Sequence, residues 1–441
     1  MINFSIKIVL IAGFLLFSLV TSTAQQIDLA KVRLQLDSLP DGPVRGSFKN
    51  GIQAFAGYVL DGKMSGEWSF WNLDGVIASN CLYKEGKKNG PEFLYDANGQ
   101  TLSLSHFKNN ILEGPYTEYY EIMGIALSGY YKEGKKDSIW TEYFPSGAMS
   151  YTKNFKLNLE HGIQTYFYQN LKIAHIETYE YGIPKGAWEY YYPDGTLLKE
   201  INFMNGLLEG SYNEYHQNGN KSVTGSYNIG LKTGKWINYF ENENPFGVGN
   251  YKLNEKHGLW KYFTEAGALE YEGNYLNDLK TGQWIYYYTN GKLESIGTYV
   301  TDEKDGLWGF FYPNDQLKQE QQWSMGNLIE TSDFYSIKGE SLFKGTLSNE
   351  NGTYFEYYPE GEIKLEATLK NGLFNDKYKG YHINKAIAFQ GQMNAGLRQG
   401  VWSFYHYNGA LESSGTYLNS EKIGTWRYYS KLGRLLNVSS Y

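Results

Sequence analysis

The chain has 441 residues, and 42 Tyr, 23 Phe and 11 Trp accompany 50 Gly but only 10 Pro. Aromatic residues are enriched in short strands and glycine in tight turns, so the composition favours an all-β fold. The formal net charge of -7 provides no basic surface of the kind that phosphate backbones or anionic lipids select, so we expect no nucleic-acid partner and no membrane-lipid recognition.

The first 24 residues have the three regions of a secretory signal. Lys7 precedes an apolar run over 8–20, and the small residues Ser22 and Ala24 follow it. The run is shorter than the roughly 20 residues that a membrane-spanning helix needs. We therefore predict a signal peptide over 1–24, cleavage after Ala24, and export across the inner membrane to the periplasm or the extracellular space.

Residues 25–41 do not fit the pattern of the rest of the chain. Four apolar residues after Asp28 fall on one helical stripe, which predicts either a short helix that caps the first edge strand or a disordered leader. These residues are Leu29, Val32, Leu36 and Leu39.

From residue 42 onward one unit recurs. Steps of 24 from Gly66, taken as position zero, land on glycine at almost every mark up to Gly306, and one step back gives Gly42. After Glu330 the register loses two residues and resumes at Gly352, so we predict a break or weak point at 330–351. Residues 42–441 thus form about seventeen units of about 24 residues, a period typical of repeat architectures.

Aromatic residues keep fixed places in the unit. Position two holds nine of the eleven tryptophans, position five is aromatic in every unit but the first, and position seventeen is usually aromatic. The tryptophans of position two are Trp68, Trp140, Trp188, Trp236, Trp260, Trp284, Trp308, Trp402 and Trp426.

Two turns separate these aromatic segments. Tyr192-Pro193-Asp194-Gly195 has Pro and Gly where a type I turn with a Gly bulge requires them. Position twenty holds only residues that tolerate left-handed geometry, such as Gly182 and Asn254. Each unit is therefore predicted to be a β-hairpin that pairs with its neighbours. The fold class that follows is all-β, an elongated repeat of β-hairpins in a single twisted antiparallel sheet.

Position fifteen is small and often glycine, as in Gly225, Gly249, Gly273 and Gly297. A glycine flanked by aromatic residues suggests that a ring from the adjacent strand lies over the bare backbone. Positions two and five have opposite parity, so they face opposite sides of the sheet unless a bulge intervenes. The sequence leaves both arrangements open.

The repeat resembles a known one. Glu272-Gly273-Asn274-Tyr275, followed by Gly282-Gln283-Trp284-Ile285-Tyr286-Tyr287-Tyr288-Thr289-Asn290-Gly291, is similar to the MORN repeat in its bacterial variant form, which includes YwqK-type, antitoxin-like proteins. The resemblance covers 42–441 and implies a hairpin repeat scaffold. It departs from the pattern where Glu92, Gln164 and Ser332 replace the aromatic residue of position two.

The histidine, cysteine and lysine residues that could form a catalytic or binding site are not expected to lie close together. The seven histidines occupy scattered registers, and His382 and His406, which share position six of adjacent units, lie about 10 Å apart, too far to hold one ion. Cys81 falls at the small position fifteen, which favours a packing role. The run Lys84-Glu85-Gly86-Lys87-Lys88 and its near copy at 132–136 are interpreted as charged, solvated turns. We predict no enzyme activity, no cofactor and no metal site.

The leading hypothesis is an exported, non-enzymatic scaffold for protein–protein interaction, on which repeated weak contacts add up. One alternative is an envelope-glycan or cell-wall binding module, because rows of aromatic rings could stack on sugars. A second alternative, an antitoxin-like neutralising protein, is implied only by the resemblance, and the predicted signal peptide argues against a cytoplasmic toxin as its target.

Overall fold

The computed structural model describes residues 41–121 and 124–441. The predicted signal peptide at 1–24 and all but the last residue of the leader at 25–41 lie outside these residues. Every named element of the described chain is a β-strand, which confirms the all-β prediction. None of the described residues belongs to a helix long and apolar enough to cross a membrane.

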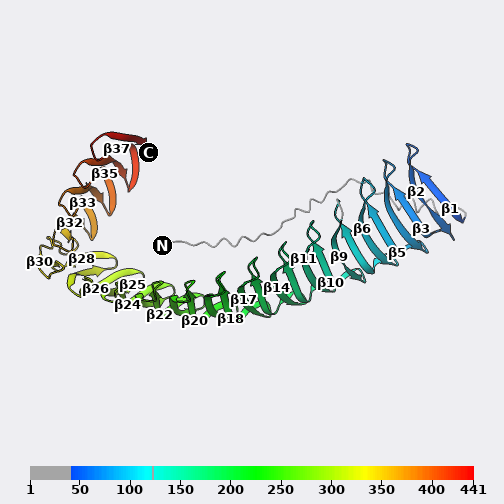
Figure 1. Cartoon of the computed structure of the whole chain (residues 1–441), viewed down its shortest axis with the longest axis horizontal. Helices are drawn as coiled ribbons and strands as arrows, with labels where there is room; N and C mark the ends of the chain where they lie inside the picture. Colours follow the sequence, from blue (N-terminus) through cyan, green and yellow to red (C-terminus); the bar gives the residue numbers. More distant parts are fainter. Residues whose placement is uncertain (1–40, 122–123) are drawn as a thin grey trace. The chain divides into compact units, whose positions relative to one another are not determined.

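The strands are consecutive antiparallel hairpins. β1 to β28 form a sheet of 28 strands, β29 and β30 a sheet of two, and β31 to β38 a sheet of eight. The chain divides into two compact units, of which the first ends at Thr196 and also includes Phe203–Gly206, whereas the second comprises Leu197–Asn202 and Leu207–Tyr441. Within each unit the strands follow one another side by side in chain order (Figure 1).

The strands of the first unit begin with β1 and end with β16. They are β1 Gly42–Ser47, β2 Gln53–Leu60, β3 Lys63–Trp71, β4 Ile77–Lys84, β5 Lys87–Tyr95, β6 Thr101–Lys108, β7 Ile111–Leu112, β8 Gly114–Tyr119, β9 Ile125–Lys132, β10 Lys135–Tyr143, β11 Met149–Lys156, β12 Leu159–Glu160, β13 Gly162–Phe167, β14 Ile173–Glu180, β15 Ile183–Pro184 and β16 Gly186–Tyr191.

β17, Leu197–Met204, has residues in both units, and the remaining strands belong to the second. They are β18 Leu207–Tyr215, β19 Lys221–Asn228, β20 Leu231–Tyr239, β21 Pro245–Lys252, β22 Glu255–Phe263, β23 Leu269–Leu276, β24 Leu279–Tyr287, β25 Leu293–Val300, β26 Glu303–Phe311, β27 Leu317–Ser324, β28 Asn327–Thr331, β29 Phe334–Tyr335, β30 Ser341–Leu342, β31 Gly352–Tyr357, β32 Ile363–Lys370, β33 Leu373–Tyr381, β34 Ile387–Asn394, β35 Leu397–Tyr405, β36 Leu411–Leu418, β37 Glu421–Tyr429 and β38 Leu435–Ser440.

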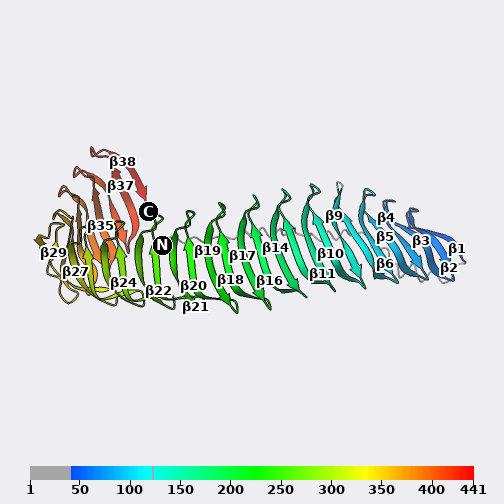
Figure 2. The same cartoon turned by 60° about the horizontal axis from the view of Figure 1, so that its bottom comes forward.

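The turn between the two strands of a unit has the predicted form. In the turn after β16, Gly195 has φ +89° and its backbone N–H donates to Tyr192 O at 2.8 Å. Tyr192 N in turn donates to Thr196 O at 2.8 Å, which closes the four-residue turn. Turns of both kinds lie along the two edges of the sheet within each unit (Figure 2).

The turn between successive units is tighter. Position twenty has positive φ as predicted, for example +76° at Gly230, but position nineteen has positive φ as well, +48° at Ile229. Two consecutive left-handed residues are typical of a type I′ hairpin turn. The left-handed geometry of position nineteen was not predicted, since Leu157, Ile229 and Met325 are not residues that favour it.

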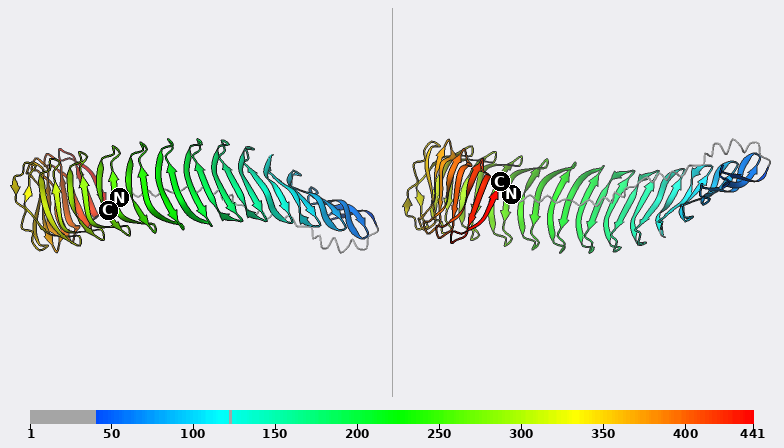
Figure 3. Two further views of the ribbon diagram at one scale, coloured as in Figure 1. Left: turned by 90° about the horizontal axis from the view of Figure 1, so that it is seen from below. Right: turned by 90° about the horizontal axis from the view of Figure 1, so that it is seen from above.

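Position zero is a bulge. Gly258 has φ +74°, and the pairing of β22 with β21 changes register opposite it, between Val248 and Asn250. Beyond the bulge, successive side chains alternate regularly between the two faces of the sheet. Trp260 and Tyr262 lie on the same face, since their rings stack at 5.9 Å between centroids. Positions two and four therefore share one face and positions three and five the other, which settles the arrangement that the sequence left open. Figure 3 shows the strands of each unit running in alternating directions across the sheet.

Strand pairing is interrupted after β28. Between β28 and β31 the only described strands are the two-residue β29 and β30, and Figure 1 places β28 and β30 between β26 and β32. The interruption is packed with apolar residues, since Phe334 and Leu347 are each 1% exposed and Tyr354 is 4% exposed.

Candidate functional site

The face that carries position two, called here the Trp face, is built from tryptophan rings laid on glycine. A Cβ added at Gly273 would lie 2.2 Å from Cδ2 of Trp284, so only glycine lets the ring settle on the backbone. Trp284 is fully buried, and its indole N–H donates to Asn274 O at 3.1 Å. The predicted ring over position fifteen is confirmed.

The same pair recurs in both large sheets, with the ring always following its glycine by eleven residues. The pairs are Gly57 with Trp68, Gly129 with Trp140, Gly225 with Trp236, Gly249 with Trp260, Gly273 with Trp284, Gly297 with Trp308, Gly391 with Trp402 and Gly415 with Trp426.

In seven units a cation lies over the tryptophan ring. Lys280 Nζ is 4.4 Å from the Trp284 ring centroid and 4.9 Å from that of Tyr299. Burial among these rings lowers the pKa of Lys280. Because all the tryptophans of position two are buried, their rings offer no free face on which a sugar or a quaternary ammonium group could stack. The cations placed in this way are Lys136, Lys232, Lys256, Lys280, Lys304, Arg398 and Lys422.

This arrangement corrects the interpretation of the two lysine runs as solvated turns. Glu85-Gly86 and Glu133-Gly134 do form turns with positive φ. The last lysine of each run instead returns to the Trp face, where Lys136 Nζ lies 4.1 Å from the Trp140 ring centroid. The signal in the sequence is the lysine or arginine four residues before the tryptophan, which was not recognised as part of the repeat.

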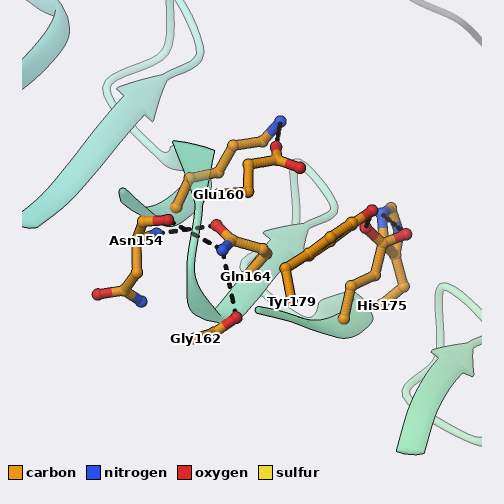
Figure 4. A network of polar contacts seen from close by, with 8 residues as sticks. Asn154, Glu160, Gly162, Gln164, His175 and Tyr179 are labelled. Carbon is orange, nitrogen blue, oxygen red and sulfur yellow. Dashed lines mark hydrogen bonds and ion pairs between the residues drawn. The ribbon is translucent and has the colours of Figure 1, made fainter. Parts of the chain in front are cut away.

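At Gln164, where position two is not aromatic, polar contacts replace the ring. Gln164 is fully buried; its side-chain oxygen accepts from Asn154 N at 2.8 Å, and its amide donates to Asn154 O at 3.1 Å and Gly162 O at 3.3 Å (Figure 4). Gln164 therefore bonds to the backbone on which a tryptophan would otherwise rest.

A histidine lies on the same face nearby. The His175 ring stacks between Tyr166 and Tyr190, with centroids at 3.9 and 5.5 Å. Burial, assisted by the positive charge of Lys153, lowers the pKa of His175 to about 4. His175 is therefore neutral at physiological pH.

The opposite face is more exposed and partly apolar. Position one, at its centre, holds large apolar side chains in several units. We call these the position-one row: Ile139 and Ile163, each 56% exposed, in the first unit, and Leu259, Leu307 and Val401, at 45%, 57% and 67%, in the second. Charged residues interrupt the row, such as Lys377 at position one, which forms an ion pair with Glu366 at 2.6 Å.

The residues considered for chemistry take separate structural places. Nε2 of His382 lies 2.9 Å from Tyr405 O, and Nε2 of His406 lies 3.0 Å from Tyr429 O, so each histidine links the turn of one hairpin to the next. Cys81 is 3% exposed, and burial raises its pKa to about 12. Across 41–121 and 124–441 no group of three or more His, Cys, Asp or Glu side chains is placed to hold a metal ion.

Comparison with known proteins identifies the repeat. The MORN repeat variant matches seven segments, each of which begins two residues before a position zero: 88–109, 184–205, 256–277, 280–301, 304–324, 350–371 and 398–419. These seven segments thus match the MORN repeat variant, and the chain is a repeat scaffold. None of the curated proteins matches it.

Similar solved structures include the crystal structure of TcdB2-TccC3-Cdc42, at 10% identity over 93% of this chain and 26% of that chain, with a TM-score of 0.13. The Tc holotoxin pore of Photorhabdus luminescens is 8% identical over 91% of this chain and 24% of that chain, with a TM-score of 0.11. The chain thus spans about a quarter of the length of these proteins. Likenesses with such TM-scores carry no argument about function.

Proposed function

We propose that this chain is an exported, non-enzymatic scaffold that binds another protein through the face opposite the Trp face. The observation that carries the proposal is the position-one row. Side chains such as Ile163 and Val401 are more than half exposed although the repeat has small or polar alternatives at this place, for example Ser211 and Thr425. Exposed apolar residues that gather on one surface are typical of interaction sites.

The division of labour between the two faces supports the same proposal. The Trp face supplies the buried core, because its tryptophan rings are buried against the backbone and most of them also lie beneath a cation. The opposite face is therefore free to vary in sequence without loss of that core. Repeated weak contacts along such a surface would add up to useful affinity.

The test uses two double variants of the mature, tagged protein, crosslinked and recovered from its own cell envelope. Ile139→Ser with Ile163→Ser alters the row. Leu157→Ser with Leu171→Ser alters turn residues of comparable exposure, 47% and 60%, and serves as the control. We expect a specific protein to be recovered with the wild type and the control and lost with the row variant, at unchanged melting temperature.

Two parallel measurements address the other functions considered. Sedimentation of the purified protein with cell wall, or with lipid vesicles, in the absence of a protein partner would contradict the proposal. Export is tested by mass spectrometry of the native protein, which we expect to begin at Gln25. An intact Met1 start would exclude cleavage after Ala24.

A further inference from the structure

The interruption at 330–351 coincides with a pocket on the Trp face. Its volume is about 310 Å³, and it is bordered by Lys304, Phe310, Lys318, Gln321, Trp323 and Tyr354, among others. All of these residues belong to the second compact unit. The volume is at the lower end of the range for small-molecule sites, about 300–1,000 Å³, so an occupant would be small.

The pocket is present because one unit of the repeat lacks the tryptophan ring of position two. In a regular unit the ring of position two covers the glycine eleven residues before it, as Trp308 covers Gly297. At the interruption the residue of position two is Ser332, and the residue that it should cover is Gln321. No tryptophan is available for this place, and the space beside Gln321 stays open.

The residues around the opening form a connected polar floor. Trp323 Nε1 donates to the side-chain oxygen of Gln321 at 3.2 Å. The amide of Gln321 lies 3.3 Å from Tyr354 Oη, which donates to Glu356 Oε1 at 3.1 Å. The network holds these side chains in place and joins β27 to β31 across the interruption.

Two lysines supply positive charge above this floor. Lys304 Nζ lies 4.8 Å from the Trp323 ring centroid, and Lys318 Nζ lies 5.7 Å from that of Phe334. Among the described residues neither ammonium group forms an ion pair, whereas Glu356, which also borders the pocket, pairs with Lys364 at 3.5 Å. Burial lowers the pKa of both Lys304 and Lys318, so each would gain from an anionic neighbour.

We propose that this pocket binds a small carboxylate attached to an aromatic or apolar body, with the carboxylate between Lys304 and Lys318 and the body against Phe310 and Phe374. Aromatic walls with a few converging polar groups are the usual make-up of a ligand site. The carboxylate can come from a free metabolite or from the C-terminus of a peptide. The site is independent of the position-one row, which lies on the other face of the sheet.

The test is titration of the full mature protein, followed by ligand-observed NMR and calorimetry. For the free-acid source the probes are phenylacetate, its uncharged analogue phenylacetamide and the amine phenethylamine. For the peptide source the probe is an acetylated pentapeptide that ends in Phe, with a free or an amidated C-terminus. We expect a carboxylate probe to bind about tenfold or more tightly than its amide, as loss of a charge-assisted hydrogen bond implies.

Matched variants locate the binding. Lys304→Met and Lys318→Met keep the apolar stem and remove the charge. Lys280→Met makes the same change at the equivalent position of the preceding unit, where Trp308 covers Gly297 and occupies the space. We expect the first two to weaken binding about tenfold and the third to leave it unchanged.

The two sources of the carboxylate are distinguished by which probes bind. Binding of phenylacetate alone would indicate a free acid, and binding of the peptide with a free C-terminus alone would indicate a peptide C-terminus. The proposal is overturned if no carboxylate probe binds, if amide or amine binds as well as acid, or if Lys280→Met weakens binding as much as Lys304→Met. None of these results depends on whether a protein partner is recovered through the position-one row.

Discussion

At the scale of single residues, the glycine of position fifteen is as important as the tryptophan that covers it. We predict that Gly273→Ala destabilises the protein by about 1–3 kcal/mol, because the new methyl group would overlap the Trp284 ring and force it to shift. Thermal or urea unfolding monitored by tryptophan fluorescence measures the change.

Gly247→Ala is the matched control. A Cβ at Gly247 would lie 3.4 Å from the nearest atom, in the Tyr262 ring, which is ordinary contact. Its effect on the free energy of unfolding should be well below that of Gly273→Ala. Equal effects would show that loss of glycine in the strand, and not the covering ring, causes the destabilisation.

His175 makes the first unit sensitive to acid. Its pKa is lowered from 6.5 to about 4, so between these values the unfolded chain binds more protons than the folded one. The free energy of unfolding should fall as pH drops from about 6.5 towards 4, by up to about 3 kcal/mol from this residue. Glu177, whose pKa is raised by burial, contributes with the opposite sign.

The variant His175→Gln isolates the histidine, because it leaves Glu177 in place. Urea unfolding of both proteins at intervals from pH 7.5 to pH 4.5 should show a smaller acid-induced loss of stability in the variant. Parallel pH profiles for the two proteins would mean that His175 is not the residue that titrates.

At the scale of the hairpin, the turn between units contains an unfavourable residue that can be improved. Ile229 is β-branched, has φ +48° and is 67% exposed. Asparagine tolerates left-handed geometry and precedes glycine in the best type I′ turns. We predict that Ile229→Asn raises the free energy of unfolding by about 0.5–1 kcal/mol.

Ile229→Leu is the control, since it changes the side chain but keeps a bulky residue in the same backbone conformation. Calorimetry of the two variants should show a rise in melting temperature for asparagine alone. A similar rise for both would point to the loss of β-branching and not to the left-handed geometry.

The hairpin is also the scale at which prediction from sequence worked best. Turn positions such as Gly195 and Gly230 were predicted because backbone conformation restricts them to few residue types, and the ring over Gly273 was predicted because bare backbone beside aromatic residues has few explanations. The positions of long polar side chains were harder to predict. Lys136 and Gln164 are flexible enough to lie in solvent or fold onto the sheet, and only the packed structure decides between these.

The candidate sites divide in the same way. Exposure of Ile139 and Ile163 follows from the alternation of the strand once position two is known to be buried. The pocket near Gln321 could not be predicted, because it depends on Tyr354 and other residues beyond the two-residue deletion, where the register that guided the prediction is lost.

At the scale of the whole molecule, the interruption remains the expected site of local opening. Regular units are held by continuous strand pairing, whereas the described pairing between Thr331 and Gly352 is limited to β29 with β30, over two residues each, and to isolated bridges such as Ser348–Asn351. Trypsin should therefore cut first after Lys338, which is exposed in the turn before Gly339, and give two large fragments.

The buried ring of Phe334 provides the control for this experiment. Phe334→Ala removes packing from the interruption, so the cut after Lys338 should become faster while cuts elsewhere keep their rates. Early cleavage confined to the regular hairpins, with 330–351 intact, would show that the apolar cluster fully compensates for the lost strand pairing.

Because each tryptophan lies on a glycine of the preceding hairpin, the contacts between hairpins have a direction. Each hairpin contributes a glycine to the contact with the next hairpin and a tryptophan ring to the contact with the previous one. Removal or duplication of one whole hairpin leaves every remaining glycine–tryptophan contact complete, whereas insertion or deletion of a few residues breaks one of these contacts. We therefore expect insertion or deletion of whole hairpins to disturb the fold far less than insertion or deletion of a few residues, so that the number of hairpins can change in evolution without loss of the core.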